Sequence, residues 1–111
     1  MELNIREKGP IRIVEVEGHL DLYDTPKLKA EMQNLLDEGH TRIVMNLGGV
    51  NFIDSSGLGA LMSIREDLVG AGGNLVISNL SPLAADLVRN NLGEVVAIFD
   101  AEAEALTFFD D

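Results

Sequence analysis

The sequence predicts a single α/β domain in which a mixed, mostly parallel sheet packs against helices. Short apolar segments alternate with amphipathic segments of helical length, in the order ββαβαβαβα. Strand–helix–strand connections of this kind form right-handed parallel crossovers, and nearly continuous apolar strands are typical of sheets covered by helices. A chain of 111 residues is long enough for one hydrophobic core, so we expect one domain over residues 1–111.

The first elements are a predicted β-hairpin and a predicted helix. Segments 2–8 and 11–18 alternate apolar and polar residues around a Gly-Pro pair at 9–10, which is typical of a hairpin with one face in water. Thr25 can then cap a helix whose first position is Pro26, where proline is favoured. The apolar face of this helix is Leu28, Met32, Leu35 and Leu36.

The middle of the chain predicts two further strands with a helix between them. RIVMNL at 42–47 is a compact apolar strand with two glycines just beyond it. Apolar residues then keep helical spacing from Leu58 to Val69, until the glycines of GAGG end the segment. NLVISNL at 74–80 is another strand of the buried type.

The last part of the chain predicts a helix, a strand and a short closing helix. Ser81 and a following proline begin a helix that runs to about Arg89. EVVAIF at 94–99 reads as the final strand, and Asp100 can cap the last helix. Two acids, Glu102 and Glu104, would then lie near the positive end of that helix.

Composition excludes several classes of function. The formal net charge is −11, from 19 acidic against 8 basic residues, so we expect no direct contact with nucleic acid, which requires basic patches. The chain has no cysteine and no apolar run long enough for a membrane span. Its first residues also lack a secretory signal pattern. We therefore expect a cytoplasmic protein without a membrane partner.

The segment NFIDSSGLGALMSIRE at 51–66 carries the strongest functional signal. It is not a phosphate-binding loop, because no lysine follows Gly57 or Gly59, and Met62 replaces the third glycine of a dinucleotide fingerprint. Neither serine has a glycine two residues before it, as a hydrolase nucleophile requires. No histidine or lysine base stands at motif spacing, so we expect a binding protein with no cofactor and no catalytic residue.

A second polar group, His19, Asp21 and Asp24, lies within six residues. Oxygen and nitrogen ligands this close could hold a divalent ion, but the spacing of a calcium loop is absent. Turn residues and acids at a helix start explain the same pattern, so we predict no metal site.

Asp54, Ser55 and Ser56 together exceed what a helix start requires. One such side chain can cap the helix, which leaves at least one hydroxyl free. A phosphate on that hydroxyl would be favoured by the positive end of the helix. It would also add about −1.5 to −2 charges beside Asp54, enough to repel a partner bound to this face.

These residues resemble the anti-anti-sigma factors of the STAS domain family. DSSGLGAL is similar to the family signature, EGHLDLYDTPKLKAEM to its Gly-x-Leu-Asp turn and first helix, and TRIVMNLGGVNFIDSSGLG to its central strand and loop. AGGNLVISNLSP and VVAIFDAEAEAL resemble its next strand and its closing strand and helix. The signature overlaps the segment of the central strand and loop, so the resemblance covers nearly the whole chain with four motifs in the family's order.

The resemblance implies a partner-switching protein. Such proteins bind an anti-sigma factor that is also a serine kinase, and thereby free a sigma factor. The kinase uses ATP to phosphorylate the serine after the motif aspartate, here Ser55, and a metal-dependent serine/threonine phosphatase reverses this. Ser56 is then a secondary acceptor or a cap. The implied partner-binding residues are Asp21, Asp24, Asp54, Ser55, Ser56 and Gly57.

One departure and two alternatives accompany this interpretation. Asp24 stands where the family commonly has a small hydroxyl residue, and its charge could favour a more basic partner. The first alternative is a STAS interaction module in a stress-signalling or transport-associated complex that controls no sigma factor. The second is an enzyme that uses Asp54 or Ser55 as nucleophile. We expect a monomer or a weak dimer.

Overall fold

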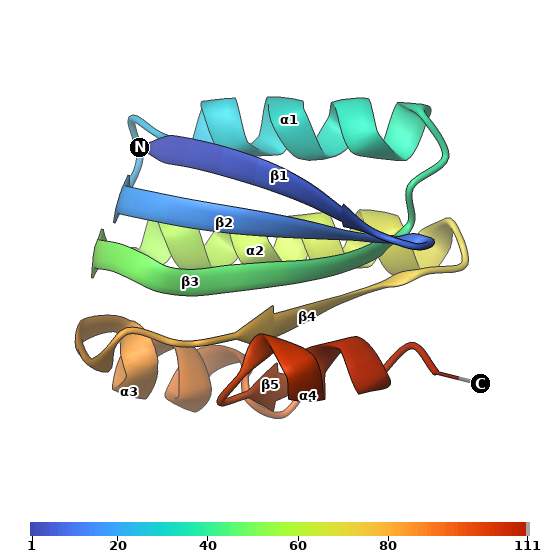
Figure 1. The fold of residues 1–111 in the computed structure, drawn as a ribbon. Helices are drawn as coiled ribbons and strands as arrows, with labels where there is room; N and C mark the ends of the chain where they lie inside the picture. The colour runs from blue at the N-terminus through green and yellow to red at the C-terminus, as the bar shows by residue number, and fades with distance from the viewer. Residues whose placement is uncertain (111) are drawn as a thin grey trace.

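Five strands form one mixed sheet, in the spatial order β1-β2-β3-β4-β5, in the computed structural model, which describes residues 1–110 (Figure 1). The strands are β1 Glu2–Lys8, β2 Ile11–Leu20, β3 Arg42–Ile53, β4 Asn74–Ser78 and β5 Ile98–Phe99. β1 runs antiparallel to β2, and every other neighbouring pair is parallel. The predicted fold class, with its order of elements, is confirmed.

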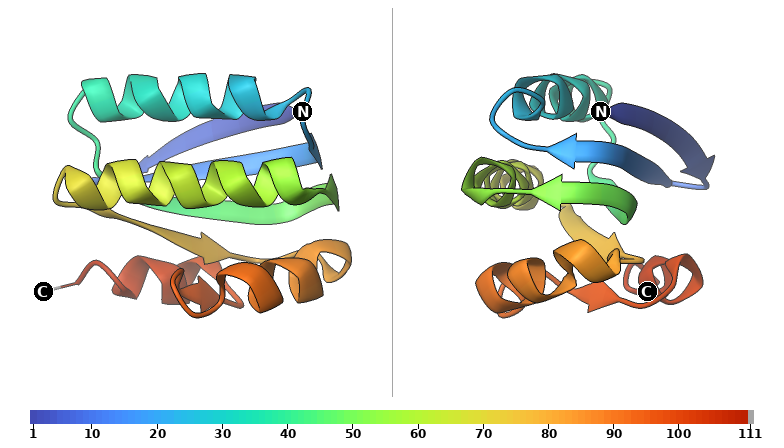
Figure 2. Two further views of the ribbon diagram at one scale, coloured as in Figure 1. Left: turned by 180° about the vertical axis from the view of Figure 1, so that it is seen from behind. Right: turned by 90° about the vertical axis from the view of Figure 1, so that its left-hand side faces the viewer.

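Helices cover both faces of this sheet, but unequally (Figure 2). The helices are α1 Thr25–Asp37, α2 Ser55–Gly70, α3 Pro82–Leu92 and α4 Glu102–Thr107. The first three pack on one face and bury the larger core, while α4 lies on the opposite face. None of the helices within residues 1–110 combines the length and the apolar character needed to cross a membrane.

Strand residues contribute alternately to the two cores, as the period of a β-strand requires. In β3, Ile43 and Met45 face the large core under α1, α2 and α3. Val44 lies between them in sequence and faces α4 together with Val76 of β4, its neighbour in register. This two-sided burial explains why the central strands are apolar throughout.

The predicted strand 42–47 proved too short, because β3 continues to Ile53. β2 is long, and after an irregularity between Glu15 and Glu17 it goes on pairing with β3. Gly49 lies opposite Glu17, and a β-carbon there would come within 2.7 Å of Glu17 Cγ. The two glycines therefore lie inside the strand and not beyond it, and at Gly49 the close approach of β2 leaves no room for a side chain.

Other boundaries also differ from the predictions. Thr25 does not cap α1: it is the first helical residue, and its hydroxyl donates to Leu22 O. The predicted strand 94–99 shortens to two residues, because Val95 and Val96 donate to Leu92 O and extend the turn after α3.

The remaining differences lie around α3 and α4. α3 runs to Leu92, and β4 ends at Ser78. Asp100 does not cap α4, whose N-cap residue is Ala101. The Asp100 carboxylate instead lies 3.4 Å from Arg89 Nη2.

Candidate functional site

The two polar segments singled out in the sequence meet at one end of the sheet. β2 and β3 are parallel, so their carboxyl ends share an edge, with Leu20 beside Ile53 in register. The backbone N–H of Asp54 donates to Leu20 O at 3.4 Å. This bond holds the loop after β2, at 21–24, against the start of α2.

Gly57 makes this close contact sterically feasible. A β-carbon at Gly57 would collide with Leu20 O and would lie 2.9 Å from Ile53 Cγ1. The residue is buried in the first turn of α2, so in this structure it sets the distance between two loops and presents no side chain to a partner.

Asp54 is the cap of α2. Its backbone is extended, and its Oδ1 accepts a hydrogen bond of 3.0 Å from the N–H of Gly57. One carboxylate oxygen therefore satisfies a donor that the helix itself cannot pair. The cap is an acid and not a serine, so neither hydroxyl of the motif is needed to start the helix.

Ser55 and Ser56 are the first two residues of α2. Ser55 is exposed and Ser56 is half-buried. Neither hydroxyl makes a hydrogen bond with any of residues 1–110. Ser55 thus presents an unengaged hydroxyl to solvent at the positive end of a 16-residue helix, where an added phosphate is electrostatically favoured.

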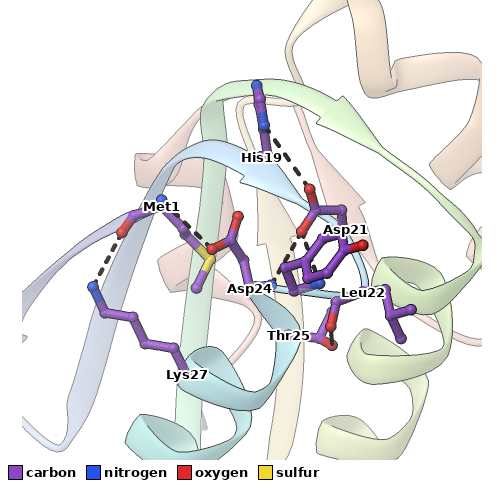
Figure 3. A network of polar contacts seen from close by, with 8 residues as sticks. Met1, His19, Asp21, Leu22, Asp24, Thr25 and Lys27 are labelled. Atoms are coloured by element: carbon purple, nitrogen blue, oxygen red, sulfur yellow. Dashed lines mark hydrogen bonds and ion pairs between the residues drawn. The ribbon is translucent and has the colours of Figure 1, made fainter.

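Asp21 builds its own turn (Figure 3). Its Oδ1 accepts the backbone N–H groups of Tyr23 and Asp24, both at 3.0 Å. Its carbonyl oxygen accepts from Thr25 N at 3.0 Å and leads into α1. An aspartate that bonds to the backbone two and three residues ahead is a recognised turn former, so Asp21 gives the loop its shape.

Asp24 is half-buried at the end of this loop. Its Oδ1 lies 3.9 Å from the amino group of Met1, and Lys27 Nζ donates to the carbonyl of Met1 (Figure 3). The acid that departs from the family pattern therefore lies next to Met1.

The predicted group of potential ligands does come together. One ligand atom from each of His19, Asp21 and Asp24 lies within 4.8 Å of the others. His19 is exposed, with Nδ1 3.9 Å from Asp21 Oδ2, while the other oxygen of Asp21 already serves the turn. The turn accounts for Asp21 without a metal, and the absence of a metal site stays a prediction.

Sequence reasoning missed the apolar side chains around Ser55. Leu22 is 63 % exposed and Tyr23 is 87 % exposed in the loop after β2, and Phe52 is 46 % exposed at the end of β3. Phe52 packs edge-on against the ring of His19 with centroids 5.9 Å apart. A signal was present, because apolar residues directly flank the turn acids in DLYD and NFID.

Leu83 extends this apolar group. It is 66 % exposed at the second position of α3, which follows β4. Because β2, β3 and β4 are parallel, α3 begins at the same end of the sheet as α2. The site therefore combines exposed apolar side chains with acids and the exposed hydroxyl of Ser55, which suits the docking of a protein surface.

Comparisons with known proteins agree on one family. The family model described as STAS domain matches residues 2–105. The anti-sigma F factor antagonist of Paenibacillus polymyxa is 25 % identical over 109 residues, which cover 96 % of this chain and 93 % of that protein. Its name describes an antagonist, in agreement with the expectation that this chain is not an enzyme.

Solved structures share the fold. An anti-sigma factor antagonist from Mycobacterium paratuberculosis superposes with a TM-score of 0.88 at 21 % identity, covering 99 % of this chain and 94 % of the other. The Bacillus cell fate determinant SpoIIAA in its phosphorylated form gives a TM-score of 0.73 at 22 % identity, covering 96 % of this chain and 98 % of the other.

Proposed function

This chain belongs to the STAS domain family, and from that premise we propose that it is an anti-sigma factor antagonist switched by phosphorylation of Ser55. In its unmodified form it binds an anti-sigma factor with serine kinase activity, so that the sigma factor is released. Phosphate on Ser55 ends this binding, and a serine/threonine phosphatase restores it. The exchange takes place in the cytoplasm, where the kinase has ATP.

The observation that carries this proposal is the division of roles at the start of α2. Asp54 caps the helix, so the exposed hydroxyl of Ser55 has no structural duty. A residue that is accessible and structurally dispensable can be modified without unfolding the domain. Ser56 is half-buried and is therefore the secondary acceptor.

The surroundings of Ser55 supply the surface that a phosphate would disrupt. Leu22, Tyr23 and Phe52 are exposed apolar side chains, and aromatic residues of this kind dominate the energy of protein interfaces. Asp21 shapes the loop that displays two of them, and Asp24 ends it. We assign these two acids to the partner-binding region on this geometry.

A local charge change is large enough to act as a switch. Two unit charges about 4 Å apart interact by roughly 4 kcal/mol at an effective dielectric of 20, and desolvation of a dianion adds to the penalty. A change of about 2.8 kcal/mol is already a hundredfold change in affinity. Neither conformational change nor refolding is needed.

Phosphosite mapping tests the assignment of the acceptor. The protein would be incubated with ATP and a lysate of its own host, and phosphopeptides would be identified by mass spectrometry. We expect phosphate on Ser55, retained in Ser56→Ala and lost in Ser55→Ala. Phosphate found on Ser56 alone, or none in lysates from several growth states, would contradict the proposal.

Binding to the host's anti-sigma factor tests the switch itself. Ser55→Ala should bind like the unmodified protein and resist inactivation by ATP, whereas Ser55→Asp should bind about a hundredfold more weakly. Glu66→Gln, on the exposed side of α2, is a control that should not alter affinity. Equal affinities of folded Ser55→Ala and Ser55→Asp would rule the mechanism out and favour a phosphorylation-independent interaction module.

A further inference from the structure

β1 is the outermost strand of the sheet and is paired on one side only (Figure 1). Its seven residues follow β2 in unbroken antiparallel register, without a bulge and without proline. An edge strand of this kind presents free backbone N–H and C=O groups that can pair with another strand, and natural edges are usually interrupted to prevent this. The β1 edge has neither a bulge nor a proline, so the only protection it carries is its four charged residues.

We propose that two copies of this chain associate through their β1 strands, antiparallel, with the two Ile5 residues facing each other across a twofold axis. The pairing joins the two sheets into one continuous sheet. The partner is thus a second copy of this chain, and the interface lies outside the Ser55 site. The proposal does not rest on the function proposed above.

In this register, the residues of one β1 strand are complementary to those of the β1 strand in the second copy. Antiparallel pairing about Ile5 places Glu2 opposite Lys8 of the second copy, and Lys8 opposite its Glu2. Asn4 then faces Arg6, Leu3 faces Glu7, and the two Ile5 side chains form an apolar pair at the centre. Opposite charges directly across an antiparallel pair are stabilising, and like charges are destabilising. No like-charged pair occurs here.

Neighbouring registers are worse. Facing residues of two paired strands must lie on the same face of the sheet. The nearest alternative registers of two β1 strands are therefore centred one residue away, on Asn4 or on Arg6. Centring on Arg6 would oppose two guanidinium groups. Centring on Asn4 would place Glu7 and Lys8 beyond the end of the opposing strand. Only the Ile5 register uses the full strand, Glu2–Lys8.

The charges that meet in this register are those without a partner inside the domain. Arg6 is bound to Glu15 and Glu102, and Glu7 lies 3.6 Å from Arg12. Glu2 and Lys8 form no ion pair with any of residues 1–110. Each would gain its counter-charge only from the second copy.

The distribution of charge over the domain also favours association through β1. Two copies that each carry a net charge of −11 repel one another over most of their surface. β1 contains two acids and two bases and has no net charge. Ile5, 37 % exposed at its centre, adds apolar area. A single strand pair is a small interface, and interfaces below about 1,200 Å² are typical of weak, transient association.

A charge swap between Glu2 and Lys8 tests the proposal. Sedimentation velocity would measure the fraction of dimer at protein concentrations between about 10 µM and about 1 mM, a range that covers weak association. Wild type should show reversible dimers at the upper end. Glu2→Lys and Lys8→Glu should each dissociate about tenfold more readily, and the double variant, which has the wild-type net charge, should recover the dimer. Glu66→Lys on α2, with the same charge change as Glu2→Lys, should leave the dimer intact. A monomeric wild type, or a double variant no better than the single ones, would overturn the proposal.

Disulfide trapping tests the register, and the chain's lack of cysteine makes single-cysteine variants unambiguous. Residues facing each other in an antiparallel pair have Cα atoms about 4.5–5.5 Å apart, within disulfide range. Ile5→Cys should therefore cross-link readily under mild oxidation, and Glu66→Cys should not. Cross-linking of Asn4→Cys or Arg6→Cys in preference to Ile5→Cys would overturn the assigned register.

Discussion

Neighbouring residues at the start of α2 have separate tasks that follow from their burial. Asp54 is half-buried and caps the helix, Ser55 is exposed and free, and Gly57 is buried against β2 and β3. Substitution should affect them differently. A change at Ser55 should alter the surface and leave stability unchanged, whereas a change at Gly57 should alter the packing beneath it.

Gly57→Ala should destabilise the domain by about 3 kcal/mol, near the upper end for overpacking a core. The added methyl group collides with the backbone carbonyl of Leu20, which cannot move without breaking the contact between the two loops of the site. Urea unfolding followed by circular dichroism measures the free energy of unfolding.

Gly59→Ala provides the matched control, two residues further along the same helix. Nothing lies within 4 Å of a β-carbon at Gly59, so alanine should stabilise α2 by about 0.5–1 kcal/mol through its higher helix propensity. Equal effects of the two substitutions, in either direction, would contradict the role given to Gly57.

The sequence singled out Ser55 and its neighbours as a candidate site because they are adjacent and their types are unusual together. The features that the sequence did not predict depend on tertiary contacts. Thr25 and Asp100 have the right chemistry for caps, but Thr25 lies within the helix and Asp100 lies beside Arg89. The exposure of Tyr23 and Phe52 depends on which face of the turn meets solvent, and local sequence does not determine this.

At the scale of elements, α4 shows how a short helix is held by its neighbours. Six residues form too few internal bonds for independent stability. Ala105 is buried on the sheet, and Glu102 accepts hydrogen bonds from Arg6 at 2.6 Å and from Asn46 at 2.7 Å. Two strands, β1 and β3, and a helix far apart in sequence are thereby connected, which local patterns do not predict.

Glu102→Gln should make stability less sensitive to acid. Burial raises the pKa of Glu102, but hydrogen bonds from Arg6 and Asn46 and the charge of Arg6 hold it below its ordinary value. The carboxylate therefore stabilises the fold fully above the unfolded pKa of about 4.3, and this contribution is lost as pH falls through the lower folded pKa.

Urea unfolding at several pH values between about 3 and 7, which span these protonation states, measures the effect. The gap in stability between wild type and Glu102→Gln should be widest at neutral pH and should close on acidification. Glu104→Gln is the control, because Glu104 is exposed on the same helix and forms no ion pair within residues 1–110. A gap for Glu102→Gln that stays constant with pH would refute the assignment.

For the whole molecule, the dominant long-range property is its negative charge. The domain measures 32 × 26 × 23 Å, and electrostatic interactions extend over about 30 Å at 0.01 M salt but only about 10 Å at 0.1 M. At low salt each acid therefore repels acids across the whole domain, whereas at higher salt only near neighbours interact. Composition alone anticipates this property, since it needs no knowledge of contacts.

Stability should therefore rise with ionic strength, by on the order of 1 kcal/mol between about 0.01 and 0.2 M NaCl, as screening relieves self-repulsion in the compact state. Glu66, Asp86 and Glu94 are exposed and form no ion pair within residues 1–110. Replacing them by Gln, Asn and Gln takes the net charge from −11 to −8, and this variant should gain less from salt. Thermal unfolding across the salt series measures both slopes. If wild type instead lost stability with salt, ion pairs such as Arg6–Glu102 would outweigh the repulsion, because screening weakens attraction and repulsion alike.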